Sequence, residues 1–216
     1  MGELVLVRHG QANSAAQDET GYDRLSDLGH QQARWLGEWL RSHDAPFDRV
    51  LMGSLRRHRE TAEGMGDMGA EAEIDARLNE LDYFNLAQAH SKATGKPAPT
   101  PDTFVSHIID IMQAWHRAEI QGEESYASFE ARVAEMLTIA ARPGRRVLCV
   151  TSGGVIGMMV RHILDLDIAR MAHLLVPIRN CSIHRVMVLP QAQILAGFNA
   201  TPHLDTPDRI HARTEY

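Results

Sequence analysis

The sequence predicts an α/β protein, a three-layer α/β/α sandwich with a mostly parallel central sheet. Three short, largely apolar strand-like runs, at 3–7, 50–52 and 147–151, each lead through polar or glycine residues toward a helical segment. Strand–turn–helix units that repeat in this way need crossover connections, which align the strands in parallel and lay helices over both faces. The repeated pattern therefore predicts a central sheet with a layer of helices on each face.

The first unit begins with the strand at 3–7, and Ser26 caps the helix that follows it. Apolar residues recur in that helix at a spacing of three and four, which buries one face of it. These residues are Leu28, Trp35, Leu36, Trp39 and Leu40. We expect this face to belong to the core.

The second and third units repeat the arrangement. Val50-Leu51-Met52 ends at Gly53-Ser54 and opens a charged helix near Leu55, whereas the run at 147–151 ends at Ser152-Gly153-Gly154 and opens an apolar helix. The charge on the second helix indicates one solvent-facing side, and the apolar third helix indicates burial.

The remaining segments are helical and then extended. A loop at 94–101 holds three prolines and a glycine, and helices are expected at about 102–119 and 125–141. Two strands, at 182–189 and 193–198, are predicted to form a closing hairpin around Pro190-Gln191.

Composition narrows the function. The 216 residues carry a formal net charge of −6, which disfavours nucleic-acid binding, and no apolar run approaches the roughly 18 residues of a membrane span. The first residues carry no basic segment or cleavage site of a secretory signal, so a cytoplasmic location is expected. Cys149 and Cys181 lack C-x-x-C spacing and are expected to be reduced structural thiols.

Polar and charged residues that could bind a ligand or take part in catalysis lie where the three predicted strands end. Arg8-His9-Gly10, Gly53-Ser54 and Ser152-Gly153-Gly154 are all expected at the carboxyl edge of the sheet, where ligands of parallel sheets bind. Arg57 lies one turn into the second helix and can point back toward the same place. Two guanidinium groups around one imidazole predict a phosphate pocket.

Four segments carry a resemblance that spans nearly the whole chain in the expected order. They are L-V-R-H-G-Q-A at 6–12, Leu25-Ser26 with Gly29 and Gln32-Ala33, Leu55 with Arg57 and Thr61-Ala62, and Leu78-Asn79-Glu80. Together they resemble the histidine phosphatase superfamily and its phosphoglycerate-mutase-like fold. The resemblance implies a single domain over 1–216 with a helical insertion at about 84–141.

Carried over by position, the resemblance also implies roles. His9 is the expected nucleophile, which takes the phosphoryl group and forms a phosphohistidine. Arg8 and Arg57 are expected to hold the phosphate oxygens, and Glu80 to protonate the leaving oxygen and then to assist water. The scheme requires no metal and no cofactor, and its partner is a small phosphorylated substrate.

The chain departs from the family pattern at Ser152, where relatives typically have a second histidine that donates to the phosphate. Its hydroxyl, or the amides from Gly153 onward, are expected to contact the phosphate, with plain helix capping as the alternative. Gly53 stands where relatives often have serine, and 81–84 lacks the usual glycine. Gln11 and Asn13 are candidates for substrate contact, the alternative being that they order the loop.

Three functions fit these observations. The leading hypothesis is a phosphatase that hydrolyses a phosphomonoester; the second is a weakly active phosphate-ester-binding or regulatory protein, which Ser152 motivates; a phosphomutase ranks third. Metal binding is disfavoured because no metal-ligand spacing occurs and His58, His90, His107 and His116 are scattered through polar helical stretches. No nucleic acid or membrane is expected as a partner, and a homodimer is left open.

Overall fold

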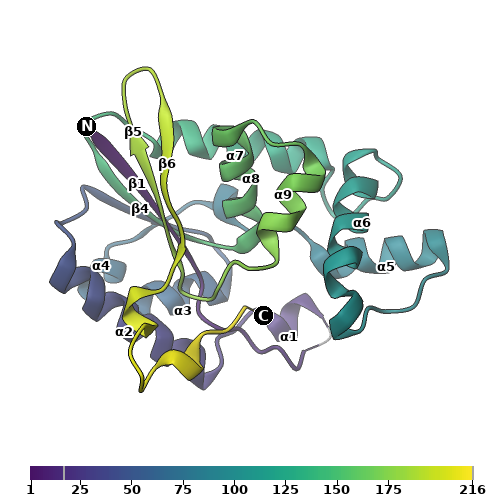
Figure 1. Ribbon diagram of the computed structural model, residues 1–216, viewed down its shortest axis with the longest axis horizontal. Coiled ribbons are helices and arrows are strands. Elements are labelled where there is room, and N and C mark those ends of the chain that lie inside the picture. Colours follow the sequence, from purple (N-terminus) through teal and green to yellow (C-terminus); the bar gives the residue numbers. More distant parts are fainter. Residues whose placement is uncertain (17, 216) are drawn as a thin grey trace.

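The computed structural model describes residues 1–16 and 18–215 and is built around one six-stranded sheet (Figure 1). Its strands are β1 (Gly2–Arg8), β2 (Arg49–Met52), β3 (Glu73–Ile74), β4 (Arg146–Thr151), β5 (Ile183–Val188) and β6 (Gln193–Ala200), in the order β3-β2-β4-β1-β5-β6. The strands β3, β2, β4 and β1 are parallel to one another, whereas β5 is antiparallel to both of its neighbours, β1 and β6. The predicted mostly parallel sheet with a closing hairpin is confirmed.

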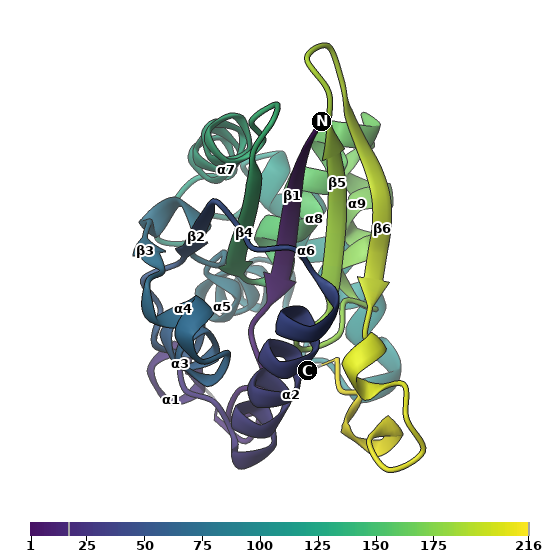
Figure 2. The ribbon, with the colours of Figure 1, turned by 90° about the vertical axis from the view of Figure 1, so that its left-hand side faces the viewer.

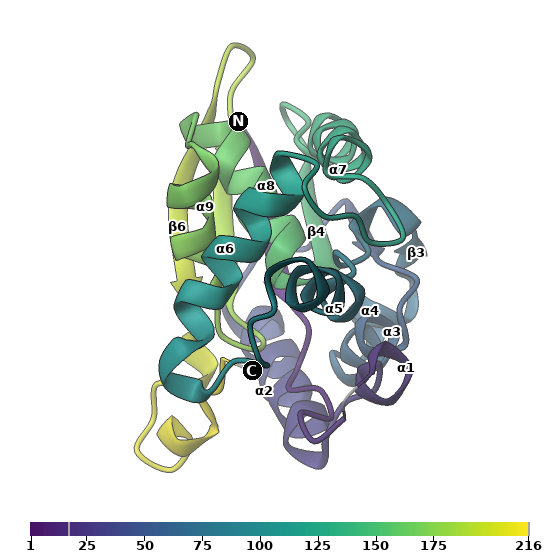
Figure 3. The same cartoon turned by 90° about the vertical axis from the view of Figure 1, so that its right-hand side faces the viewer.

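Helices cover both faces of this sheet. In the described part of the chain they are α1 (Glu19–Tyr22), α2 (Asp27–His43), α3 (Arg56–Gly64), α4 (Asp67–Ala70), α5 (Tyr83–Thr94), α6 (Phe104–His116), α7 (Tyr126–Ala140), α8 (Gly153–Leu164) and α9 (Ile168–Leu175). Figure 2 shows α2, α3 and α4 on one face, and Figure 3 shows α6, α7, α8 and α9 on the other. The predicted three layers are therefore present.

Strand β1 divides the core into two parts. Side chains alternate along a strand, so Leu4 and Leu6 pack beneath α7 and α8, whereas Val5 and Val7 pack beneath α2 and α3. All four side chains are fully buried. Burial on both faces explains why this strand reads as an unbroken apolar run.

Several helix boundaries follow from local chemistry. The Ser26 hydroxyl accepts a hydrogen bond from the Gly29 amide at 3.1 Å, which confirms the predicted cap of α2. Helix α5 ends at Thr94 because Gly95 adopts a left-handed conformation, with φ of 71°. The two-residue strand β3 is too short to leave a sequence pattern.

The C-terminal segment folds back beside the carboxyl end of β1. It contains two short 3₁₀ turns, at Pro202–Leu204 and Ile210–Ala212. Gln32 of α2 anchors it by donating from Nε2 to the Ala212 carbonyl at 2.7 Å. Figure 1 shows this segment beside the loops that follow the strands, and Arg8 donates to the Glu215 carbonyl, so the segment contributes to the same edge of the sheet.

Among the described residues, no helix combines the length and apolar character that a membrane span requires.

Candidate active site

The sheet register brings the three predicted strand ends together. Arg8 at the end of β1 lies opposite Thr151 at the end of β4, and Met52 at the end of β2 lies opposite Val150. His9, Gly53 and Ser152 therefore leave the sheet at one edge, as the sequence predicted. This edge carries a cavity of about 330 Å³.

The cavity has a charged end and an apolar wall. Arg8, His9, Arg57, Glu80 and Gly153 line the charged end, together with Glu19 and Glu215. The wall is formed by Tyr22, Tyr83, Phe84, Phe104, Ile108, Leu175 and Val176. Tyr22 and Phe84 meet edge to face, with ring centroids 5.9 Å apart, so the aromatic groups form a continuous surface. Five of the predicted site residues, Arg8, His9, Arg57, Glu80 and Gly153, thus line one cavity.

His9 is oriented by its backbone neighbour. Its Nδ1 lies 2.8 Å from the Gly10 carbonyl oxygen, so that nitrogen carries the proton and donates, which leaves the lone pair on Nε2. Burial lowers the pKa of His9 well below its usual range, and the charges of Arg57 and Arg8 lower it further. The imidazole is therefore neutral and nucleophilic at neutral pH.

The two arginines keep unpaired donors beside His9. Arg57 is 1% exposed and pairs through Nη1 with Glu19 at 2.6 Å and Asp23 at 3.1 Å. Arg8 donates from Nη1 to the carbonyls of Ile178 and Glu215.

Within residues 1–16 and 18–215, neither Nε of these arginines has a hydrogen-bond partner, and Arg8 forms no ion pair. Buried cationic donors without acceptors are costly unless an anion satisfies them. Arg8 and Arg57 are therefore suited to bind an oxyanion.

Glu80 is held at the cavity by two backbone amides. Its Oε1 accepts from Leu81 at 2.9 Å, and its Oε2 accepts from Gly154 at 3.0 Å in the first turn of α8. A Cβ atom at Gly154 would lie 2.2 Å from Oε1, so only glycine allows this approach. The carboxyl group is fixed on the side of the cavity that Gly153 also lines.

Ser152 has a different neighbour from the one expected. Its hydroxyl makes no capping bond to α8 and instead lies 2.6 Å from Nε2 of His58. Both side chains are fully buried, and neither is among the described residues that line the cavity. Gly153 lines the cavity and Ser152 does not. The cavity lining therefore gives no direct evidence for the expected contact between the Ser152 hydroxyl and phosphate.

His58 is the residue that the sequence interpretation missed. Its helix is polar, as predicted, but its ring is buried, with its centroid 5.7 Å from that of His9. Burial lowers the pKa of His58 well below its usual range, followed by the charge of Arg57. The signal was present: buried positions 57, 58, 61 and 62 form one face of α3.

Gln11 and Asn13 hold the loop after β1. Ser26 Oγ donates to Gln11 Oε1 at 2.7 Å, and Asn13 Nδ2 donates to the Gly21 carbonyl at 3.0 Å. Neither residue is among the described residues that line the cavity. These contacts favour the loop-ordering alternative.

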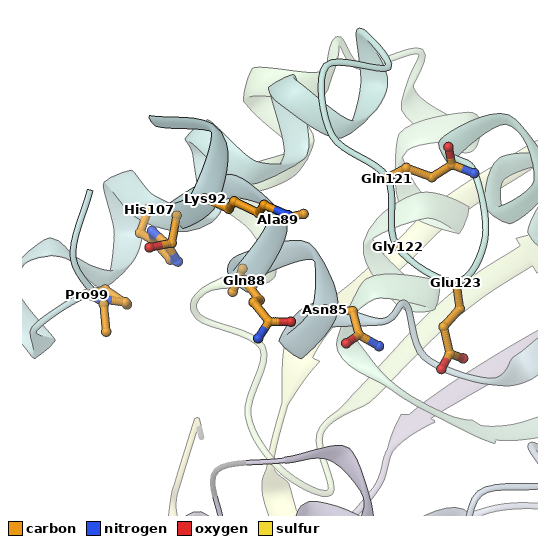
Figure 4. Close-up of a pocket in the computed structure, with 12 residues that line it drawn as sticks. Asn85, Gln88, Ala89, Lys92, Pro99, His107, Gln121, Gly122 and Glu123 are labelled. Atoms are coloured by element: carbon orange, nitrogen blue, oxygen red, sulfur yellow. The ribbon is translucent and has the colours of Figure 1, made fainter. Parts of the chain in front are cut away.

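A second cavity, of about 980 Å³, lies along α5 (Figure 4). Figure 4 shows Gln88, Lys92, His107 and Gln121 around it, and no predicted site residue lines it. Across the described ranges, no three His, Cys, Asp or Glu side chains are arranged to hold a metal ion. Cys149 and Cys181 are free and buried, as predicted.

The sequence profile of the histidine phosphatase superfamily (branch 1) matches residues 4–201. The chain belongs to this superfamily. That span includes five strands of the sheet in full and β1 from Leu4 onward, and it contains Arg8, His9, Arg57, Glu80 and Gly153.

Related proteins include both phosphatases and mutases. A "probable phosphoglycerate mutase GpmB" of Citrobacter koseri is 28% identical over 96% of this chain and 97% of its own length. A 2,3-bisphosphoglycerate-dependent phosphoglycerate mutase of Methylorubrum populi is 38% identical, but over only 39% of this chain and 43% of its own length.

Solved structures share the fold. A phosphoserine phosphatase of Entamoeba histolytica, solved with phosphoserine, has a TM-score of 0.69 at 20% identity and covers 94% of this chain and all of its own. The glucosyl-3-phosphoglycerate phosphatase of a mycobacterium, in complex with VO3, has a TM-score of 0.62 at 24% identity, covering 92% of this chain and 98% of its own. At these identities the likeness supports the architecture of this superfamily member.

Proposed function

We propose that this superfamily member is a phosphatase that hydrolyses a small phosphomonoester through a phosphohistidine at His9. The observation that carries the proposal is the ring of His9. Its Nδ1 is tied to the Gly10 carbonyl, and it shares a cavity with two arginines whose Nε atoms lack partners in the described chain. A neutral imidazole with a free Nε2 beside two unpaired guanidinium donors suits attack on a phosphoryl group.

The first step forms the phosphoenzyme. The Nε2 lone pair of His9 attacks phosphorus, and the bond from phosphorus to the ester oxygen breaks. Arg8 and Arg57 bind the equatorial oxygens and offset their charge as it spreads. Glu80, in its protonated form, gives its proton to the departing oxygen.

The second step returns the enzyme to its starting state. Glu80, now ionised, takes a proton from water as the water oxygen attacks phosphorus. The bond between phosphorus and His9 Nε2 breaks, and inorganic phosphate leaves. Apart from the substrate and the attacking water, every group in the cycle is a side chain of this protein.

The cavity wall indicates the class of leaving group. Beyond the charged end, the described lining is largely aromatic and aliphatic, with Tyr22, Tyr83 and Phe84 at its centre. Arg8 and Arg57 are the cations among the described lining residues, and both are needed for the phosphoryl group. We therefore favour an apolar, uncharged leaving group over one that carries a carboxylate.

The charges that line the cavity also favour a phosphatase over a phosphomutase. The mutases named above support a phosphoglycerate as substrate, and a phosphoglycerate has a carboxylate that needs its own donor. Glu19 and Glu215 face this cavity and would repel such a group. Isomerisation of 3-phosphoglycerate, measured beside aryl phosphate hydrolysis, separates the two activities.

Hydrolysis of p-nitrophenyl phosphate tests the proposal. We expect turnover by wild type, loss of about 10³-fold or more in His9→Ala, and no change in His43→Ala, which removes an exposed histidine of α2. Equal slow release by wild type and His9→Ala would refute it. Tight binding of the ester without turnover would instead favour the binding-protein alternative.

A further inference from the structure

The pair His58 and Ser152 has no role in the proposed cycle, although it adjoins it directly. His58 packs against His9, with ring centroids 5.7 Å apart, and Ser152 immediately precedes Gly153, which lines the cavity. The 2.6 Å bond between them joins α3 to the start of α8 across 94 residues of sequence. Both side chains are fully buried.

The backbone makes room for the imidazole at Gly53. A Cβ atom there would lie 2.1 Å from Nδ1 of His58 and 2.7 Å from its Cε1, which no real side chain tolerates. Gly53, His58 and Ser152 therefore depend on one another. The serine that the resemblance expects at 53 is incompatible with this ring position.

The bonding around His58 identifies its tautomer. In the described chain Nδ1 has no hydrogen-bond partner, whereas Nε2 faces the Ser152 oxygen. A buried N–H without an acceptor is less tolerable than a buried lone pair without a donor. With the proton on Nε2, which donates to the Ser152 oxygen, the donor left without an acceptor is the Ser152 hydroxyl, next to the cavity-lining Gly153, rather than an Nδ1–H that faces Gly53. A bound anion can satisfy the first donor but not the second, so the proton is placed on Nε2.

This donation leaves the hydroxyl proton of Ser152 available. His58 is the hydrogen-bond partner of that hydroxyl among residues 1–16 and 18–215, and Ser152 makes no cap to its own helix. The oxygen already accepts from His58, so its proton is turned to another acceptor. Ser152 does not itself line the cavity, but it directly precedes Gly153, which does, and its partner His58 packs against His9, so a phosphoryl oxygen bound at His9 is the acceptor considered for this proton.

Building on the proposed function, we propose that His58 is a positioning residue that holds the Ser152 hydroxyl as a donor to the phosphoryl group on His9. The hydrogen bond runs from His58 Nε2 to the Ser152 oxygen, and from the Ser152 hydroxyl to a phosphate oxygen. An imidazole supplied by α3 thus acts at the place where the resemblance expects a histidine at the end of β4. No proton is transferred and no bond to phosphorus changes in this arrangement.

Substitutions test whether the two residues act as one. Ser152→Ala removes the donor, and His58→Phe keeps a ring in the core but removes Nε2. We expect each to lower kcat for p-nitrophenyl phosphate by about 10²-fold, with KM changed by less than about twofold, because the bond strengthens in the transition state. The double variant should be no slower than either single one, since all three lack the same donor.

Two results of this series would overturn the inference. One is wild-type kcat in His58→Phe while Ser152→Ala is slow; the other is a double variant whose loss is the product of the single losses. Rescue offers a positive check: Ser152→His in a His58→Ala background should restore kcat by about tenfold or more over His58→Ala alone. Absence of rescue together with multiplicative losses points to a purely structural pair.

The tautomer can be measured without any substitution. Long-range ¹H–¹⁵N correlation spectra of the wild-type protein should show His58 protonated at Nε2 and unprotonated at Nδ1. A proton on Nδ1 would commit the Ser152 hydroxyl to His58 and overturn the inference even if a variant failed to fold. Equal activity of wild type and His9→Ala is a separate outcome, which removes the proposed function and this inference with it.

Discussion

Replacing Gly53 by Ala tests the packing of His58 through stability rather than activity. Gly53 is not among the glycines with positive φ, so alanine is allowed by its backbone, and the cost arises from contacts alone. The new Cβ would meet His58 Nδ1 at 2.1 Å and Asn79 Oδ1 at 2.8 Å. Because Ser152 holds the far side of the ring, the imidazole cannot retreat without losing its hydrogen bond.

We expect Gly53→Ala to cost about 1–3 kcal/mol, the range for overpacking in a core. In a His58→Ala background the two shortest of the three nearest contacts are gone and the one to Asn79 is left, so the same change should cost at least about 1 kcal/mol less. Urea unfolding of the four proteins gives this coupling. Gly197→Ala is the matched control, since its Cβ meets nothing nearer than 3.8 Å.

The reasoning fails if Gly53→Ala costs the same in both backgrounds to within about 0.5 kcal/mol. That result would mean that the ring of His58 does not lie against Gly53. A cost in the Gly197→Ala control would show that glycine replacement itself, and not contact with the ring, is responsible.

Three further predictions concern the arginines, the wall and pH. Arg57→Lys keeps the charge but loses Nε, so kcat/KM should fall about 10²-fold, whereas Arg56→Lys on the exposed side of α3 should change little. Phe84→Ala should lower kcat/KM for an aryl phosphate about tenfold without altering inhibition by inorganic phosphate; an equal loss in both would contradict the assigned wall. Burial lowers the pKa of His184 to about 3 and that of His203 to about 4, so the unfolded chain binds protons that the folded chain does not. Stability should therefore fall by about 1 kcal/mol for each as pH drops from 7 to 5.5, and equal urea midpoints at both pH values would contradict this.

The layers and the edge that carries the site could be predicted because they rest on local pattern. Strand β1 is apolar at four successive positions, Leu4 to Val7, which indicates burial on both faces, and its end at Arg8 marks the edge. The cap at Ser26 is equally local, since a hydroxyl three residues before an amide satisfies it.

Hydrogen bonds between residues that lie far apart in the sequence could not be predicted from local pattern. The bond from His58 to Ser152 joins residues 94 apart, and the anchoring of the C-terminal segment by Gln32 spans 180. Arg56 and Arg59, on the exposed side of α3, make the helix strongly charged, so its sequence does not indicate that the opposite side is buried. A search for residues on the same helical face as Arg57 would have placed His58 inward.

A rapid-quench experiment with ³²P-labelled aryl phosphate tests the central claim most directly. A phosphohistidine is labile to acid and stable to alkali, so we predict alkali-stable label on the peptide that contains His9 within the first turnover, and none in His9→Ala. Turnover by the wild-type protein with no label at His9, or with the same label in His9→Ala, would contradict the account.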